Sequence, residues 1–575
     1  MVMLAEKAEP RLTIATETIA EDTQGIRCLD WDRDRFDIEF GLQNGTTYNS
    51  FLIRGEKTAL VDTSHAKFRQ QYLDILTGFI DPKQIDYLII SHTEPDHSGL
   101  VKDLLQLAPQ IVVVASKVAI QFLEGFVHQE FERIQVKSGD TLDLGNGHEI
   151  EFVSAPNLHW PDTMLSYDRK TETLFTCDVF GMHYCSDDTY DENLAAIEAD
   201  YHFYYECLMA PNARSVLSAL KRMKKLGDIT TIATGHGPLI RHNLLELTGR
   251  YQKWSEAQTK GETTVVVFYF SDYGYSDRLS QAIAHGVTKT GVAVEMLDLR
   301  TADPHEVREF TSEATGIIIG SPPISGPSAD IASEAIGTIK ASVNKKQAFG
   351  LFESGGGNDL SVYPLQNGLK QLGLKQIFPS IQIKATPTET TYQQCDEAGT
   401  DMGQKVGLKK AIKQMKSLDS DVDKALGRLS GGLYIITAKK GDLGSAMLAS
   451  WVSQASFEPL GLTIAVAKDR AIEALMQVGD TFVLNVLAED NYQGLMKHFL
   501  KRFAPGADRF AGVKTQPGKN GSPILSEAVA YLECQVSTRM ELSDHWIVYA
   551  TIQQGRVSNP DLLPAVHHRK VGNHY

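Results

Sequence analysis

The sequence predicts a multidomain protein of mixed α/β and β class. A chain of 575 residues is longer than one hydrophobic core usually supports. Short β-rich runs alternate with helix-length stretches up to residue 417, whereas shorter strands with frequent turns follow residue 424. We therefore expect domains at residues 26–260, 261–417 and 425–575, with a polar linker at residues 418–424.

The first domain is expected to be an α/β unit with turns at Asn44-Gly45 and Asn146-Gly147. Its expected elements are strands at 58–62, 87–90, 111–115 and 150–154, a helix at 67–80, a hairpin at 163–178 and a last strand from Thr230.

The second and third domains differ in their strand pattern. Five apolar runs separated by helix-length segments predict a doubly wound parallel sheet in the second domain. These runs lie at 264–270, 292–299, 316–320, 348–352 and 381–385, and an amphipathic helix at 408–416 follows. Closely spaced strands predict a small β-barrel in the third domain. These strands lie at 432–437, 460–466, 481–486 and 545–552.

Composition excludes some classes of partner. The net charge of −16 argues against a nucleic-acid partner, which needs a basic footprint. The six cysteines show no CxxC pairing, so we expect free thiols in a reducing compartment. The N-terminus shows no apolar signal-peptide core, and no run approaches the roughly eighteen apolar residues of a membrane span. We therefore expect a cytoplasmic protein without a membrane span.

A metal site is predicted directly after the run Tyr87–Ile90. His92, Glu94, Asp96 and His97 offer four ligand-type side chains within six residues. The run is too short for a core helix and reads as a buried strand, so the ligands lie on the loop that follows it.

Three further ligand candidates, His159, Asp178 and His236, follow predicted strands later in the first domain. Together with the loop they resemble the metallo-β-lactamase fold, in which an HxHxDH loop and later His, Asp and His residues hold two metals. The sequence departs from that pattern at Glu94, where the hydrolases use histidine.

The resemblance implies a division of the seven ligands between two ions. His92, Glu94 and His159 would bind one metal, Asp96, His97 and His236 the other, and Asp178 would bridge them. Each ion then has two imidazoles and two carboxylates. This mixed set suits a pair of iron ions better than zinc-activated water at a three-histidine site.

The HxExDH form resembles the flavodiiron proteins, specifically their three-domain class in cyanobacteria and other oxygenic phototrophs. The resemblance covers the whole chain. It implies a metallo-β-lactamase-like αββα sandwich, a flavodoxin-like doubly wound sheet and a flavin reductase-like split β-barrel. It also implies a dimer in which the FMN of one subunit serves the di-iron site of its neighbour.

FMN is expected at the second domain, where a loop with hydroxyl and glycine residues follows a strand and precedes a helix. Two later loops would flank the isoalloxazine ring by analogy. The candidate residues are Ser271, Tyr273, Gly274, Tyr275 and Ser276, then Pro323 and Ser325, then Gly355 and Gly356.

A second flavin, FMN or FAD, is expected in the third domain. The segment containing Ser450, Trp451 and Ser453 resembles the flavin-lining segment of flavin reductases, and Asn485 and Asp544-His545 match positions near the flavin or nicotinamide. Because no GxGxxG fingerprint is present, NAD(P)H would bind transiently against the flavin.

The expected activity is reduction of O2 to water, with electrons passing from NAD(P)H through the flavins to the di-iron site. A ferredoxin-like protein is an alternative donor, and a homodimer or a hetero-oligomer with a paralogue is the expected assembly. The sequence leaves open NO reduction at the same irons, a zinc hydrolase fused to flavin modules, and a non-catalytic subunit. His183 is either a proton donor beside the irons or an ordinary loop histidine.

Overall fold

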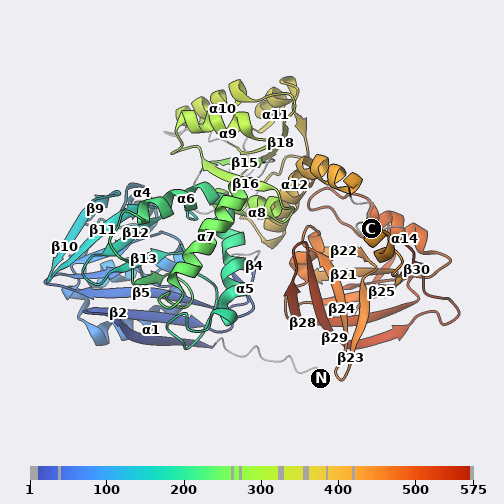
Figure 1. Cartoon of the computed structure of the whole chain (residues 1–575), viewed down its shortest axis with the longest axis horizontal. Helices are drawn as coiled ribbons and strands as arrows, with labels where there is room; N and C mark the ends of the chain where they lie inside the picture. The colour runs from blue at the N-terminus through green and yellow to red at the C-terminus, as the bar shows by residue number, and fades with distance from the viewer. Residues whose placement is uncertain are drawn as a thin grey trace.

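The computed structural model describes residues 11–36, 40–260, 264–270, 275–321, 329–353, 362–383, 386–417 and 421–569. Figure 1 shows three successive domains, coloured blue to green, yellow-green and orange to red along the chain. The expected fold class is confirmed, with two α/β domains followed by a β domain. Among the described residues, no helix is long and apolar enough to cross a membrane.

The first domain is a sandwich of two sheets with helices on both outer faces. The larger sheet has the order β1 (Leu12–Ala20), β2 (Thr23–Asp30), β5 (Thr46–Arg54), β6 (Thr58–Val61), β7 (Tyr87–Ile90), β8 (Val112–Ser116) and β9 (Arg133–Val136). The smaller sheet has the order β10 (Thr141–Gly145), β11 (His148–Ser154), β12 (Met164–Asp168), β13 (Thr173–Cys177) and β14 (Thr231–Thr234). A separate short pair consists of β3 (Arg35–Phe36) and β4 (Phe40–Gly41).

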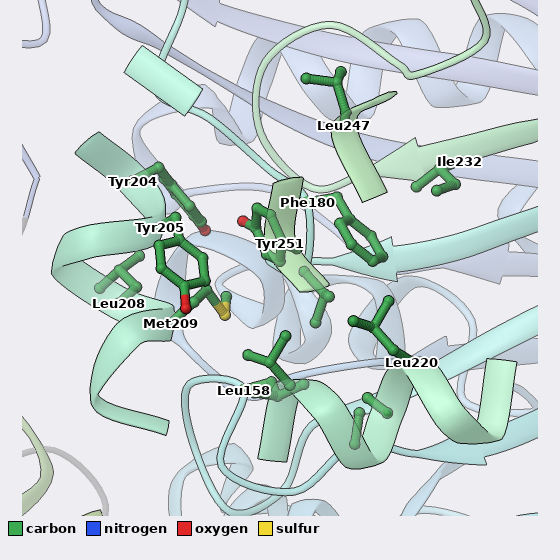
Figure 2. Packing of buried hydrophobic residues seen from close by; sticks show 14 of the residues in the cluster. Leu158, Phe180, Tyr204, Tyr205, Leu208, Met209, Leu220, Ile232, Leu247 and Tyr251 are labelled. Carbon is green, nitrogen blue, oxygen red and sulfur yellow. The ribbon is translucent and has the colours of Figure 1, made fainter. Parts of the chain in front are cut away.

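Three buried clusters define the layers of this domain. The first lies between the larger sheet and the helices α1 (Arg69–Phe79), α3 (Val101–Leu107) and α4 (Lys117–Val127). The second lies between the two sheets. The third, part of which Figure 2 shows, lies between the smaller sheet and the helices α5 (Leu194–Tyr204), α6 (Ala213–Met223) and α7 (Leu244–Thr259).

The strand β7 shows how the sequence produces these layers. Leu88 and Ile90 join the cluster beneath the helices, whereas Tyr87 and Ile89 face the second sheet. Side chains alternate along a strand, so an uninterrupted apolar run is buried on both faces. The sheet itself starts before the expected boundary at residue 26, because β1 pairs with β2 in antiparallel fashion.

The second domain is a five-stranded parallel sheet between two helical layers. The strand order is β16 (Ala293–Asp298), β15 (Thr264–Tyr269), β17 (Gly316–Gly320), β18 (Ala348–Phe352) and β19 (Lys375–Gln376). One face packs on α8 (Tyr275–Thr288) and α12 (Glu389–Ser417). The other packs on α9 (Pro304–Glu313), α10 (Ala329–Ser342) and α11 (Val362–Gln371). When the five strands are numbered within this domain in chain order, they lie in the order 2-1-3-4-5, which is that of flavodoxin-like sheets.

The fifth strand of this sheet differs from the prediction of a strand at 381–385. The ladder with β18 forms at Lys375–Gln376, and only an isolated bridge joins Phe352 to Ile381. Pro379 lies between these two points and has no N–H to donate to a ladder. The edge strand is therefore split, and residues 384–385 lie outside the described part of the chain.

The third domain is a seven-stranded antiparallel sheet. Its order is β22 (Leu443–Ala449), β21 (Tyr434–Lys440), β25 (Thr481–Val486), β28 (Ala530–Glu541), β29 (His545–Val557), β24 (Leu460–Ala467) and β23 (Val452–Phe457). Two short pairs join β20 (Gly431–Gly432) to β30 (Val566–His567), and β26 (Thr515–Pro517) to β27 (Pro523–Leu525). Two α-helices are described in this part of the chain: α13 (Asp421–Leu426), which begins in the expected linker at 418–424 and extends past it, and α14 (Tyr492–Leu500).

Charged side chains connect the domains. Arg214 on α6 contacts Glu295 on β16 at 3.4 Å, which joins the first domain to the second. On α12, Glu397 contacts Arg509 of the third domain at 3.1 Å and Asp401 contacts Arg502 at 2.8 Å. The long helix α12 therefore packs on the sheet of its own domain and also contacts the third domain.

Candidate metal centre

The loop after β7 supplies four of the seven expected ligands. His92 lies two residues after the end of the strand. Glu94 occupies the N-cap position of the short helix α2 (Pro95–Ser98), which carries Asp96 and His97. Pro95 occupies the first turn of α2, where its fixed φ suits the helix and its missing N–H costs nothing. The loop thus turns sharply and keeps all four side chains buried.

The other three expected ligands follow strands of the smaller sheet. His159, Asp178 and His236 lie beyond the carboxyl ends of β11, β13 and β14. β13 and β14 are parallel, and β11 runs in the same direction because two antiparallel pairings separate it from β13. The three ends therefore meet at one edge, where the N–H of Met164 bonds to the carbonyl of Ser91 in the other sheet.

The seven side chains form two groups that share Asp178. Its Oδ2 lies 3.5 Å from His92 Nε2 and 3.6 Å from His159 Nε2. Its Oδ1 lies 3.0 Å from His97 Nε2 and 3.3 Å from His236 Nε2. One carboxylate oxygen thus faces each group, which is the arrangement of a bridging ligand.

The other two carboxylates each belong to one group. Glu94 Oε2 lies 3.0 Å from His159 Nε2 and 3.3 Å from His92 Nε2. Asp96 lies 3.3 Å from His236 Nε2 and 3.6 Å from His97 Nε2. His92, Glu94, His159 and Asp178 offer ligand atoms that all lie within 4.8 Å of one another, as do Asp96, His97 and His236.

The far sides of three imidazoles are held by hydrogen bonds. His92 Nδ1 lies 2.9 Å from Asp162 Oδ1, and His236 Nδ1 lies 2.6 Å from the carbonyl oxygen of Thr47. His159 Nδ1 lies 2.5 Å from the side-chain amide of Gln281, which belongs to the second domain. The acceptors beside Nδ1 of His92 and His236 keep a proton there and leave Nε2 free to bind a metal.

The inward-facing atoms fit bound metal ions. Asp96 Oδ1, His159 Nε2, Asp178 Oδ2 and His236 Nε2 are buried and form no hydrogen bond with the described residues. Buried polar atoms are rarely left without a partner, and two ions between these groups would satisfy all four. The nitrogen and carboxylate donor set suits iron or another transition metal.

Electrostatics keep the carboxylates in the form that binds a metal. Burial opposes the ionisation of Glu94, but His159 and His92 beside it lower its pKa to about 2. Burial likewise opposes protonation of His236, yet Asp178 and Asp96 raise the pKa of its imidazole to about 10. The negative carboxylates that stabilise a protonated imidazole here would stabilise a metal cation bound in place of that proton.

Close backbone approach also shapes the centre. A Cβ on Gly235 would lie 2.7 Å from Cε1 of His97 and 3.0 Å from the backbone carbon of Cys177. Only glycine therefore lets β14 deliver His236 beside His97.

Several residues beside the centre are not indicated by the sequence pattern. Tyr204 on α5 donates its hydroxyl to Asp178 Oδ1 at 3.0 Å, and burial raises the pKa of this phenol well above its usual value. Asp162 follows His159 by three residues, which is a weak local signal. Gln281 and Thr47 carry no local signal, because a different domain and a distant strand place them.

His183 lies on a buried loop segment beside the centre. It is buried, its Nδ1 lies 2.8 Å from Thr46 Oγ1, and its ring centroid lies 4.8 Å from that of His236. Burial and the neighbouring His236 lower its pKa well below the usual value. The imidazole is therefore neutral, which fits a role as a hydrogen-bonding neighbour of the ligands.

The structure describes two of the expected FMN residues in the second domain. Tyr275 and Ser276 begin α8 beyond the carboxyl end of β15, and Ser276 Oγ donates to the carbonyl of Phe270 at 2.6 Å. The remaining candidates lie outside the described residues: Ser271, Tyr273, Gly274, Pro323, Ser325, Gly355 and Gly356.

The expected flavin segment of the third domain lies at the junction of β22 and β23. Ser450 is buried, and its hydroxyl has no hydrogen-bond partner among the described residues. Trp451 is 39% exposed and lies 5.2 Å from the ring of His545, while Ser453 donates to the carbonyl of Gln454. Asn485, in contrast, uses its amide to bond Ile435, Thr437 and Leu525 inside the domain.

Comparison with known proteins assigns the chain to a family. Three family models match in succession: the ODP family beta lactamase at residues 46–237, Flavodoxin at 267–399, and the Flavin reductase like domain at 426–573. A Nostoc sp. protein, putative diflavin flavoprotein A 3, is 68% identical over 100% of both chains. A core structure titled "Metal soaked Flv1 flavodiiron core from Synechocystis sp. PCC6803" matches with a TM-score of 0.65 and 37% identity, over 70% of this chain and 100% of that one.

The chain belongs to the flavodiiron protein family. Diflavin flavoprotein A 1 of Synechocystis sp., another relative, is 66% identical over 99% of each chain. The resemblance stated from the HxExDH loop is confirmed, and so is the order of the three domain types. The family model for the ODP family beta lactamase matches a range that includes every expected ligand from His92 to His236.

Proposed function

We propose that this flavodiiron chain is an NAD(P)H-dependent oxygen reductase, in which electrons pass through FMN to a di-iron centre that reduces O2 to water. The observation that carries the proposal is the arrangement of seven buried ligand-type side chains in two groups bridged by Asp178. Reducing one O2 to two waters takes four electrons and four protons, so each turnover consumes two NAD(P)H.

The proposed iron ligands are His92, Glu94, Asp96, His97, His159, Asp178 and His236. When bound there, iron would supply one-electron redox and Lewis-acid chemistry, and flavin would convert the two-electron donor into single electrons. Glu94 replaces the histidine of the hydrolase pattern, so the set contains three carboxylates. Their combined charge supports a redox metal pair over zinc-activated water.

The residues around the centre exclude water and hold protons. Each of the seven ligands is less than 8% exposed. The hydroxyl of Tyr204 keeps a proton next to Asp178 Oδ1, because burial raises its pKa. Asp162 and Thr47 orient His92 and His236 so that the Nε2 atoms face inward.

Two flavin sites complete the proposal. FMN would bind at residues 271–276, and the second flavin, FMN or FAD, would bind near Ser450, Trp451 and Ser453. The unbonded hydroxyl of Ser450 and the half-exposed indole of Trp451 support the second site. A ferredoxin-like protein is the alternative electron donor. All six cysteines are free thiols, which supports a reducing, cytoplasmic location.

A dimer forms part of the proposal, as a homodimer or as a hetero-oligomer with a paralogue.

Anaerobic purification with quantification of iron, zinc and FMN tests the proposal, followed by O2 uptake with NADH, NADPH and a reduced ferredoxin. We expect about two iron ions per chain and O2 consumption without net release of hydrogen peroxide. Stoichiometric zinc without iron would contradict the redox function and favour a hydrolase. Anaerobic NO consumption faster than O2 consumption would replace O2 by NO as the substrate.

A further inference from the structure

The second domain reaches into the metal centre of the first through α8. Gln281 on this helix is 4% exposed, and its amide nitrogen lies 2.5 Å from His159 Nδ1. One turn earlier, the Arg278 guanidinium lies 4.0 Å from Glu94 Oε1. Figure 1 shows α8 on the side of its domain that faces the rest of the chain. The helix therefore contacts two residues of the group formed by His92, Glu94 and His159.

The chemistry of His159 defines what Gln281 must provide. His159 Nε2 faces Glu94 at 3.0 Å and Asp178 at 3.6 Å, so Nε2 is the atom directed at the metal. A neutral imidazole that binds a metal through Nε2 carries its proton on Nδ1 and needs an acceptor there. A glutamine side chain offers an acceptor as well as a donor.

The amide of Gln281 is free to present that acceptor. Its Oε1 forms no hydrogen bond with the described residues, although it is buried. A half-turn of the terminal amide exchanges the positions of Nε2 and Oε1. The carbonyl oxygen then lies beside Nδ1 of His159 and accepts a hydrogen bond from its N–H. This rotation breaks no other hydrogen bond between Gln281 and the described residues, and it satisfies an otherwise unbonded oxygen.

The residue beside Nδ1 of His159 comes from a different domain than the residues beside Nδ1 of His92 and His236. The acceptors behind His92 and His236 are Asp162 and the carbonyl of Thr47, both in the first domain. The partner of His159 lies in the second domain, 122 residues further along the chain. The hydrogen bond that orients His159 therefore depends on how the second domain packs against the first.

We propose that Gln281 is a positioning residue that fixes the Nδ1–H tautomer of His159 and thereby couples docking of the second domain to metal binding by His92, Glu94 and His159. The proposal rests on the proposed function in one respect, that His159 binds metal through Nε2. Because coupling between two equilibria is reciprocal, metal binding also stabilises the docked position of α8.

Metal titration of three full-length variants tests the acceptor role. Gln281→Met keeps the length of the side chain without its amide, and Gln281→Glu keeps an acceptor. The matched control, Gln393→Met, removes a buried glutamine of the same domain that bonds Glu397 on its own helix. The metal-free proteins are titrated anaerobically with Co²⁺, whose visible absorption reports the ligand geometry.

We expect two Co²⁺ ions per chain in the wild type, in Gln281→Glu and in Gln393→Met. In Gln281→Met, one of the two ions should bind about 10- to 100-fold more weakly, with an altered absorption spectrum. Unchanged binding of both ions in Gln281→Met would overturn the proposal, and so would equal loss in Gln281→Glu. If the wild type binds no metal, the proposed function fails instead.

Hydrogen exchange of α8 gives a second reading that does not depend on activity. We expect Co²⁺ to slow amide exchange in residues 275–288 of the wild type and of Gln393→Met, but not of Gln281→Met. If Gln281→Met does not fold, Gln281→Leu replaces it in both measurements. Exchange that Co²⁺ leaves unchanged in the wild type would also overturn the coupling.

Discussion

Replacing Asp162 by asparagine should weaken the metal centre without removing a ligand. Asp162 is fully buried, and its Oδ1 accepts from His92 Nδ1 at 2.9 Å. Its Oδ2 accepts from both the N–H and the hydroxyl of Thr93, at 2.8 and 2.5 Å. Asparagine has the same shape, but one of the two oxygens becomes an NH2 group that only donates.

Neither orientation of the new amide satisfies all of these partners. If its oxygen stays on Thr93, the NH2 group donates to His92 Nδ1, and the ring proton moves to the metal-facing Nε2. If the amide is reversed, the NH2 group meets two buried donors of Thr93. Either mismatch costs about 1–3 kcal/mol. Since about 1.4 kcal/mol corresponds to a factor of ten, metal affinity should fall by about 10- to 100-fold.

Metal content and anaerobic titration with Fe²⁺ or Co²⁺ measure this loss. The matched control is Asp168→Asn, because Asp168 is also fully buried and its Oδ2 lies 2.8 Å from His148 Nδ1. Asp168 and His148 are not among the proposed ligands, so this variant should lose stability and still bind both metals. Wild-type metal affinity in Asp162→Asn would refute the tautomer argument.

Three other substitutions test separate parts of the structure. Glu94→His should lower iron content and O2 uptake while flavin content stays constant, and unchanged uptake would argue against Glu94 as a ligand. Arg509→Ala leaves the buried Glu397 without its cation, which should cost about 3 kcal/mol and release the third domain sooner in limited proteolysis. Burial raises the pKa of Glu295 from 4.5 to about 8 despite the partly exposed Arg214, so the folded state retains a proton that the unfolded state has lost. Stability should therefore fall between about pH 5 and about pH 8, by at most about 1.4 kcal/mol per pH unit. Glu295→Gln should remove this slope in thermal unfolding, and an unchanged slope would assign it to other groups.

The sequence was sufficient where the signals were local. The uninterrupted run Tyr87–Ile90 forms β7 with the predicted bounds, because a strand buried on both faces leaves no polar position. The ligand-type residues after β7, β13 and β14 also follow from local order, since each directly continues a strand. Their convergence required the two sheets to face each other, and the resemblance to a known fold supplied that part.

Other features depend on contacts that no local pattern records. Gln281 is separated from His159 by a domain boundary, and Tyr204 comes from a helix whose own pattern is that of an ordinary core helix. The apolar run that begins at Ile381 predicts the fifth strand of the second domain at 381–385, but the ladder with β18 forms earlier, at Lys375–Gln376. Asn485 has a residue type suited to flavin binding, yet its side-chain amide bonds Ile435, Thr437 and Leu525 of its own domain.

The unequal support of the histidines has a consequence for how the centre assembles. Asp162 and Thr47 hold His92 and His236 from within the first domain. These two imidazoles are therefore oriented as soon as the two sheets of the sandwich close. His159 gains its hydrogen-bond partner at Nδ1 only when α8 has packed against the first domain. The group of Asp96, His97 and His236 should accordingly bind metal first, and the group that contains His159 should report on whether the second domain is in place.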